Sequence, residues 1–350
     1  MDVVKTKLWI VDEKMDIHNT CPQIKEAAMW ITDNEVVAFP TETVYGLGAN
    51  AYSDAAVEKI FKAKGRPSDN PLIIHISNKE QLQKLVKRVP PIAEELMEVF
   101  WPGPLTLVLE KGEGIAERVT AGLSTVAVRM PDHPVALSLL TEANTPVAAP
   151  SANVSGKPSP TTAAHVFEDL AGKIAGIVDG GATGVGVEST VLDLTTDIPM
   201  ILRPGGVTRE QIEEVIGSVA VDPALEENGQ APKSPGLKYK HYAPQAKLVL
   251  VDGNDEFIQT LVTKAKEEQK KVGVLTTNEN AEKFHADVVL PCGTKDDLHT
   301  VAQHLYEVLR KFDQYDLDII YSEIFPEKGV GKAIMNRLTK AAGGDILKSN

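Results

Sequence analysis

The loop between residues 62 and 71, with the sequence KAKGRPSDNP, concentrates positive charge between a predicted helix and a predicted strand. Lys62 and Lys64 lie at the end of that helix, where the helix dipole favours cations. Arg66 needs a different explanation, because it lies between a glycine and a proline in a loop that holds its guanidinium in a limited set of positions. A guanidinium group matches phosphate oxygens with paired hydrogen bonds. The pattern therefore predicts that Arg66 binds a phosphate.

Hydroxyl and amide side chains follow a second predicted strand, which ends at Ala149. The string PSANVSG comes directly after it, and a helix is predicted from Ala163, with Thr161 or Thr162 as its cap. Hydrogen-bond donors at helix N-termini favour phosphate groups. Ser189 in the string GVEST and Arg203 in the string LRPGG add a hydroxyl and a guanidinium group to these donors. The residues predicted to form this donor set are Ser151, Asn153, Ser159, Ser189 and Arg203.

Several common catalytic and nucleotide-binding motifs are missing or incomplete. The chain has no G-x-S-x-G sequence, and its two cysteines stand far apart. Gly331-Lys332 resembles the end of a Walker A loop, but Ala333 replaces the Ser or Thr. Residues 46–51 fit G-x-G-x-x-A, yet six residues separate them from the preceding strand, so we do not expect a dinucleotide site. By itself, His75 inside an apolar strand favours a structural role.

Short apolar runs and helical periodicities alternate through the first 220 residues and predict an α/β domain with a substantial mixed sheet. A helix carrying Val57, Ile60 and Phe61 on one face is expected after a cap at Ser53 or Asp54. The string from Thr41 to Gly48 is compatible with a turn. Strands are predicted at 36–39, 72–76, 105–109, 125–130, 146–149, 176–179, 190–194 and 200–203.

The region 221–245 is rich in proline and glycine and lacks apolar periodicity, which predicts a linker. Its end is basic and aromatic (KYKHY, residues 238–242), which a passive spacer would not need. Strand and helix patterns then resume and indicate a small parallel sheet with flanking helices. We therefore divide the chain into residues 1–220, a linker or active-site lid at 221–245, and a C-terminal domain at 246–350.

The composition limits the class of protein. With 43% hydrophobic and 24% charged residues, the chain is an ordinary globular protein rather than a disordered one. No apolar run is long enough to span a membrane, and two isolated cysteines exclude a disulfide framework or a cysteine zinc site. We expect a cytoplasmic protein. Its net charge of −13 opposes stable nucleic-acid binding, which depends on phosphate neutralisation.

Taken together, these segments resemble the threonylcarbamoyl-AMP synthase family in its two-domain form. Any one string is weak evidence, but all of them occur in order over nearly the whole chain. The resemblance implies a YrdC-like N-terminal domain, with a mixed twisted sheet and flanking helices, and a small C-terminal α/β Rossmann-like domain. The matching strings are PTETVYGLG (40–48), KAKGRPSDNPLIIH (62–75), APSAN (149–153), GVEST (186–190), LRPGG (202–206) and GVGKAIMNRLTKAA (329–342).

The resemblance also implies a reaction in which L-threonine, bicarbonate and ATP give threonylcarbamoyl-AMP and pyrophosphate, for tRNA modification. The residues implied for threonine are Thr43, His75, Arg129, Ser189 and the backbone of Ala149. Those implied for ATP are Arg66, Asn70, Thr125, Ser151, Ser159, Arg203 and Tyr242, and catalysis is implied for Lys64, Arg66, Ser151 and Asn153.

On this interpretation Mg²⁺ arrives with ATP, and no dedicated metal site is expected. The intermediate passes to a separate tRNA threonylcarbamoyl transferase, so contact with tRNA is weak or indirect, and no membrane is involved. Two alternatives are an RNA-binding or ribosome-associated module without catalysis, which the net charge of −13 opposes, and a carbamoyltransferase, which would carry cysteine-rich zinc segments.

Overall fold

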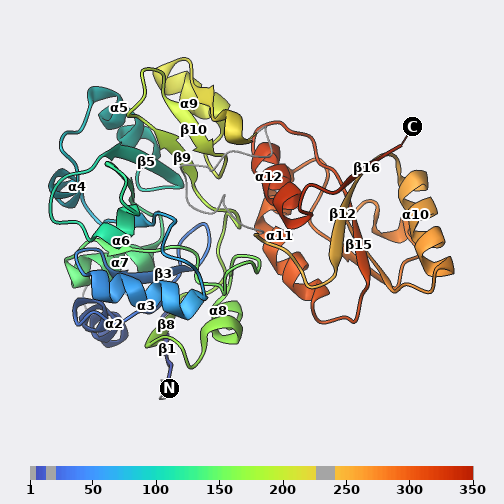
Figure 1. Ribbon diagram of the computed structural model, residues 1–350, viewed down its shortest axis with the longest axis horizontal. Coiled ribbons are helices and arrows are strands. Elements are labelled where there is room, and N and C mark those ends of the chain that lie inside the picture. The colour runs from blue at the N-terminus through green and yellow to red at the C-terminus, as the bar shows by residue number, and fades with distance from the viewer. Residues whose placement is uncertain (1–4, 13–20, 226–240, 350) are drawn as a thin grey trace. The chain divides into compact units, whose positions relative to one another are not determined.

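The computed structural model describes residues 5–12, 21–225 and 241–349 (Figure 1). These residues form two compact units. The first takes residues 5–225 apart from two short loops. The second takes residues 241–349 together with those loops, Gly156–Pro158 and Val185–Val187. Of the predicted lid, residues 226–240 lie outside the described part of the chain.

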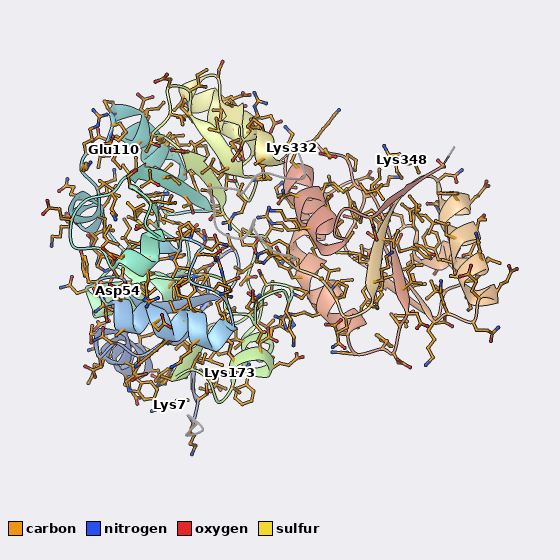
Figure 2. The ribbon with its side chains drawn as sticks, viewed as in Figure 1. Lys7, Asp54, Glu110, Lys173, Lys332 and Lys348 are labelled. Carbon is orange, nitrogen blue, oxygen red and sulfur yellow. The ribbon has the colours of Figure 1, made fainter. Side chains whose placement is uncertain are left out.

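The strands of the first unit form an 11-stranded mixed sheet with the order β1-β8-β2-β3-β7-β4-β6-β5-β9-β10-β11. Lys7, labelled in Figure 2, begins β1, and its N–H donates to the carbonyl of Ala175 just before β8. The strands are β1 (Lys7–Ile10), β2 (Val37–Phe39), β3 (Gly46–Asn50), β4 (Ile73–His75), β5 (Leu105–Glu110), β6 (Thr125–Arg129), β7 (Val147–Ala148), β8 (Gly176–Asp179), β9 (Thr190–Asp193), β10 (Met200–Arg203) and β11 (Ala220–Val221).

Helices cover both faces of this sheet because alternate strand residues are apolar on both faces. In β2, Ala38 packs with one group of helices, while Val37 and Phe39 pack with α2 and α7 on the opposite face. The first group comprises α3, α4, α5, α6, α8 and α9. The helices are α2 (Pro22–Thr32), α3 (Asp54–Lys64), α4 (Lys79–Leu85), α5 (Pro91–Phe100), α6 (Glu117–Thr120), α7 (Pro134–Ala143), α8 (Ala163–Leu170) and α9 (Arg209–Ile216).

One part of the sheet has no helix layer among the described residues of this unit. The outward-facing apolar residues of β4, β5, β6, β9 and β10 form a small cluster to which only strand residues contribute: Ile73, Val108, Ala127, Val191 and Leu202, with Met200 beside them. Side chains two positions further along these strands point to the same face. They include His75 in β4 and Arg129 in β6, so polar residues of the predicted site lie where the sheet is not covered by a helix.

The strands predicted for this unit are present, with bounds that differ by at most one residue at either end, but β3 is a correction. The string from Thr41 to Gly48 was interpreted as compatible with a turn, but its last three residues belong to the strand Gly46–Asn50, which pairs antiparallel with β2. Its glycines reflect crowding, since a Cβ on Gly48 would lie 2.8 Å from the ring of Phe39 and 2.8 Å from a methyl of Val147. The G-x-G-x-x-A string therefore does not begin a helix and is not a dinucleotide-binding turn.

The second unit contains a five-stranded, all-parallel sheet with the order β14-β13-β15-β12-β16. Within this unit, α10 lies on one side of the sheet and α11 and α12 on the other (Figure 1). This is the predicted small α/β fold. Its elements are β12 (Lys247–Asp252), α10 (Asp255–Glu267), β13 (Val272–Thr276), β14 (Val288–Pro291), α11 (Leu298–Phe312), β15 (Ile319–Glu323), α12 (Gly331–Ala341) and β16 (Ile346–Lys348).

Candidate active site

Three segments singled out in the sequence meet around Tyr45. The N–H of Tyr45 donates to the carbonyl of Pro160 at 2.9 Å, and its carbonyl accepts from the N–H of Ala152 at 2.8 Å. The N–H of Leu47 donates to the carbonyl of Pro150, also at 2.8 Å. These backbone bonds fix the loop before β3, the loop after β7 and the segment before α8 as one scaffold.

Lys64 connects the two halves of the K-x-R and S-x-N pair. It is the last residue of α3 and is buried, and its Nζ donates to the carbonyls of Ser151 (2.5 Å) and Asn153 (2.7 Å). The hydroxyl of Ser151 in turn donates to Oδ1 of Asn153 at 2.6 Å. The ammonium charge thus lies directly beneath the S-x-N loop. Lys64 holds this loop in place and makes it electropositive.

Arg66 follows the end of α3, where Gly65 adopts a left-handed conformation with φ of 61°. The N–H of Arg66 donates back to the carbonyl of Phe61 at 3.0 Å, which closes the helix with a Schellman-type cap. The backbone of Arg66 is therefore fixed by helix geometry. Further along the same loop, Asn70 is fully buried, and neither atom of its side-chain amide has a hydrogen-bond partner among the described residues.

Arg129 and His75 stand side by side because β4 and β6 pair in parallel with these two residues in register. The guanidinium of Arg129 donates from Nη1 to the hydroxyl of Thr43 at 2.9 Å and from Nε to the carbonyl of Gly103 at 3.2 Å. Three of the predicted threonine-binding residues thus lie together. Ala149 also belongs here, since its N–H donates to the carbonyl of Ile73.

Glu42, to which the sequence assigned no role, lies 2.5 Å from Nη2 of Arg129. Arg129 is buried and Glu42 is largely buried, with 4% and 13% of their side chains exposed. This distance is that of an ion pair, although the two groups lack hydrogen-bond geometry. The negative charge of Glu42 therefore compensates the buried guanidinium.

Ser189 and Arg203 form a second polar group. Arg203 donates from Nε and Nη2 to the carbonyl of Ser189 at 3.1 and 2.9 Å. The Ser189 hydroxyl lies 2.7 Å from that of Thr106, a buried residue of β5 that the sequence analysis missed. Period-2 alternation in a strand of otherwise apolar residues was the signal that could have identified Thr106.

Ser159 is fully buried and donates its hydroxyl to Oε1 of Glu188 at 2.6 Å. Glu188 precedes Ser189, so this contact brings Ser159 close to the Ser189–Arg203 group. Glu188 belongs to the GVEST string, and the sequence predicted no role for it. Thr125 begins β6 opposite Glu110, and the described residues give its side chain no hydrogen bond to the other candidates.

Four cations of this unit are buried: Lys64, Arg66, Arg129 and Arg203. Glu42 and Glu188 lie among them, and Asp169, which accepts from the N–H of Val154 beside the S-x-N loop, is also buried. Burying a cation is costly unless an anion compensates it, so buried guanidinium and ammonium groups are suited to bind anionic ligands. The site can therefore hold carboxylate and phosphate groups even though the whole chain carries a net charge of −13.

Comparisons with known proteins agree with this architecture. Residues 30–205 match the Sua5, YciO and YrdC family, which carries the description "Telomere recombination". Residues 207–343 match the "Threonylcarbamoyl-AMP synthase, C-terminal domain" family. A threonylcarbamoyl-AMP synthase of Bacillus subtilis is 57% identical over 346 residues, which is 99% of this chain and 100% of that relative. The chain belongs to the threonylcarbamoyl-AMP synthase family.

A second relative, the threonylcarbamoyl-AMP synthase of Pyrococcus abyssi, is 52% identical over 331 residues, with 93% of this chain and 96% of the relative covered. The crystal structure of P. abyssi Sua5 complexed with L-threonine matches with a TM-score of 0.93 and 50% identity, over 99% of this chain and 100% of that one. This similarity confirms the predicted α/β fold with a YrdC-like domain and a C-terminal domain.

In this member of the threonylcarbamoyl-AMP synthase family, Tyr242 belongs to the second unit. Its ring stacks on Tyr306 of α11 with centroids 5.2 Å apart, and Arg337 of α12 lies 6.0 Å from the same ring. Its backbone has a φ of 65°, which non-glycine residues rarely adopt. Such a conformation persists only where the surroundings enforce it, and it is common at functional sites. The second unit therefore holds Tyr242 in a fixed conformation.

The cysteines take no part in this site. Burial raises the pKa of the Cys292 thiol, and its sulfur donates to the carbonyl of Val301. Over the residues that are described, no three His, Cys, Asp or Glu side chains gather in a way that could hold a metal ion. The described helices are also too short or too polar to cross a membrane.

The neutral imidazole of His75 gives the family member a pH-dependent stability. Burial, together with the charge of Arg129, lowers the pKa of His75 to about 3, and Nδ1 lies 3.3 Å from the carbonyl of Ile73. In the unfolded chain the pKa is about 6.5. The contribution of His75 to the free energy of unfolding is therefore fully present above pH 6.5 and is lost as the pH falls toward about 3. At pH 5.5 this loss is about 1.4 kcal/mol. Urea unfolding at pH 7.5 and 5.5 should show this loss.

His75→Gln serves as the comparison, because glutamine cannot gain a proton in this range. We expect the loss between pH 7.5 and 5.5 to be smaller in the variant by about 1.4 kcal/mol. An equal loss in both proteins would show that His75 does not titrate on unfolding.

Proposed function

We propose that the chain is an L-threonylcarbamoyladenylate synthase, which converts L-threonine, bicarbonate and ATP to threonylcarbamoyl-AMP, pyrophosphate and water. The observation that carries this proposal is the buried guanidinium of Arg129, fixed between Thr43 and Gly103 on the part of the sheet without a helix layer. The matching P. abyssi structure is of Sua5 complexed with L-threonine, which supports the assignment of this pocket to an amino acid.

In the threonine pocket, Arg129 would bind the substrate carboxylate through the N–H groups that its protein partners leave. A guanidinium has five N–H groups, so two protein acceptors do not exhaust it. His75 stays neutral at physiological pH and so adds no second positive charge beside Arg129. Thr43, Ser189 and the backbone of Ala149 would supply the remaining polar contacts to the amino acid.

The ATP site would be formed by the loop after α3 and the segments around Ser151, Ser159 and Arg203. Asn70 supports this assignment, because a fully buried amide without partners is costly and is explained by a bound ligand. Arg66 and Arg203 would neutralise phosphate charge, while Ser151, Ser159, Thr125 and Tyr242 would fix the nucleotide. Lys64 and Asn153 would keep the phosphate-binding loop in shape.

The chemistry then needs positioning and charge neutralisation more than acid–base groups. The threonine amine combines with bicarbonate to form a carbamate, and water leaves. A carbamate oxygen attacks the α-phosphorus of ATP, the bond to the β-phosphate oxygen breaks, and pyrophosphate departs. Preorganised cations stabilise the charge that develops on the phosphates. The nucleotide substrate would be MgATP, with phosphates and water supplying most of the metal ligands.

The product is a mixed anhydride that hydrolyses in water, so the site must exclude solvent. The segment that includes Tyr242 would act as the lid. We further propose that a separate tRNA threonylcarbamoyl transferase receives the intermediate and that contact of this chain with tRNA is weak or indirect. Two free cysteines fit a reducing compartment, and we propose the cytoplasm.

Product analysis tests this function. We expect mass spectrometry to detect threonylcarbamoyl-AMP when the purified protein is incubated with ATP, Mg²⁺, L-threonine and bicarbonate. With carbon-13 bicarbonate the product should carry the label. An adenylate without the label, or one that forms with other amino acids equally well, would contradict the proposal.

A further inference from the structure

Arg129 keeps binding capacity although it is almost completely buried. Its Nε and Nη1 each donate one hydrogen bond, to Gly103 and Thr43, and its Nη2 faces Glu42 at 2.5 Å. At least two of its five N–H groups therefore remain for a ligand within the described structure. Arg129 can hold a carboxylate without giving up its partners, so binding of the substrate does not require Glu42 to leave.

Glu42 has unused acceptors where Arg129 has unused donors. Both of its carboxylate oxygens are inaccessible to solvent, and neither accepts a hydrogen bond from any described residue. An ionised carboxylate has about four acceptor sites, and leaving them empty in a buried position is costly. The cost is removed when a ligand brings N–H donors into the pocket. Among the described residues, Glu42 is the only carboxylate from the family-like sequence strings that contacts Arg129.

The charges of this pair select the kind of ligand. Arg129 and Glu42 together are neutral, so a simple carboxylic acid would bring one uncompensated negative charge into the pocket. A zwitterionic amino acid brings none: its carboxylate can face Arg129 while its α-ammonium faces Glu42. Because isolated buried charges are unfavourable, the pair favours the zwitterion.

We infer that Glu42 is a specificity-determining residue that binds the α-ammonium group of threonine, while Arg129 binds its carboxylate. This inference rests on the proposed threonine site. Glu42 also orients the amine, since the α-amino and carboxylate groups of one substrate are held by two side chains that are themselves in contact. It thereby fixes the nitrogen that becomes the carbamate.

In a competing explanation, Glu42 does not bind the ammonium group. Its carboxylate could instead occupy the place of the substrate carboxylate on Arg129 and leave when threonine arrives. The two explanations predict effects of opposite sign. Removal of the charge weakens threonine binding if Glu42 holds the ammonium, and it strengthens the binding of every carboxylate if Glu42 is a stand-in.

The test compares L-threonine with 3-hydroxybutyrate, which has the same carbon chain and hydroxyl but no amine, by NMR titration of the full-length protein. The variants are Glu42→Gln, which keeps the size of the side chain, and Glu94→Gln as a control, since Glu94 is exposed on α5. We expect the preference for threonine over 3-hydroxybutyrate to fall at least roughly tenfold in Glu42→Gln, as for loss of a charged hydrogen bond. The control should keep the preference of the unmodified protein.

An unchanged preference in Glu42→Gln, including one in which both ligands bind more tightly, would overturn the inference. Failure of the unmodified protein to bind threonine would instead overturn the proposed function. Thermal melting shows whether each variant is folded. If Glu42→Gln does not melt cooperatively, Glu42→Asp carries the test: the retracted carboxylate should weaken threonine binding more than 3-hydroxybutyrate binding, and equal changes would contradict the inference.

Discussion

Replacing Arg66 with alanine is expected to lower kcat for pyrophosphate release by on the order of 10²–10³-fold, the usual loss when one preorganised group that stabilises the transition state is removed. The backbone of Arg66 is held by the cap of α3, through Gly65 and the bond to the carbonyl of Phe61. That cap needs no side chain at position 66. The variant should therefore melt within a few degrees of the unmodified protein.

Arg88→Ala is the matched control, because Arg88 is an exposed arginine of the same unit and lies outside the candidate site. Its activity should stay within about twofold of that of the unmodified protein, as for most surface substitutions. Steady-state pyrophosphate release and thermal melting, measured for the unmodified protein and both variants, test this prediction. Normal turnover by a folded Arg66→Ala protein would show that Arg66 does not act on the phosphates.

Ending the chain after Leu225 is expected to separate binding of the two substrates. The shortened protein keeps β11, which pairs with β10, and both helix layers of the first unit. Thr43, His75 and Arg129 all remain, so we expect the affinity for threonine to change little. Tyr242, which we propose contacts the nucleotide, is lost. Because an aromatic contact with a nucleotide base is worth ~1–3 kcal/mol, we expect the affinity for ATP to fall by roughly 5- to 150-fold.

Isothermal titration with threonine and with a non-hydrolysable ATP analogue measures both effects on one preparation. The full-length protein with Tyr306→Phe, which keeps the stacked ring beside Tyr242, is the control and should bind both ligands normally. Full affinity for the nucleotide and full turnover in residues 1–225 would show that Tyr242 is dispensable. Loss of threonine binding would show that the shortened chain is not properly folded.

Local sequence patterns were sufficient for most strands and helices, because apolar runs and caps are local signals. They failed at β3, where the glycines suggested a turn. A strand there depends on Phe39 and Val147, whose side chains fill the space above Gly48 and leave no room for a Cβ. The partner Val147 lies about a hundred residues away in the chain, so no local pattern contains this information.

In the candidate site, too, some residues could be identified from the sequence and others could not. Chemical type and position pointed to Arg66 and Arg203 as candidate anion-binding residues, whereas Arg129 was assigned only through the family resemblance. The sequence could not show that Glu42 pairs with Arg129, because their meeting depends on the parallel pairing of β4 with β6 and on the fold of the loop before β3. Thr106 was missed for a similar reason: it becomes a neighbour of Ser189 only when β5 and β9 pair.

Lys64 illustrates how a structure refines a role that the sequence suggests. The family resemblance implied a catalytic role for Lys64. Its Nζ instead donates to the carbonyls of Ser151 and Asn153, so its charge acts through the loop that it holds. We therefore propose that Lys64 positions the S-x-N loop and that Arg66 is the cation directed to the phosphates.

The most direct test of the account is pyrophosphate release by the full-length protein with MgATP, with threonine and bicarbonate omitted in turn. Release that requires both co-substrates is the predicted result, because a carbamate must form before the α-phosphorus can be attacked. Release that proceeds at the same rate without threonine, or without bicarbonate, would contradict the proposed reaction.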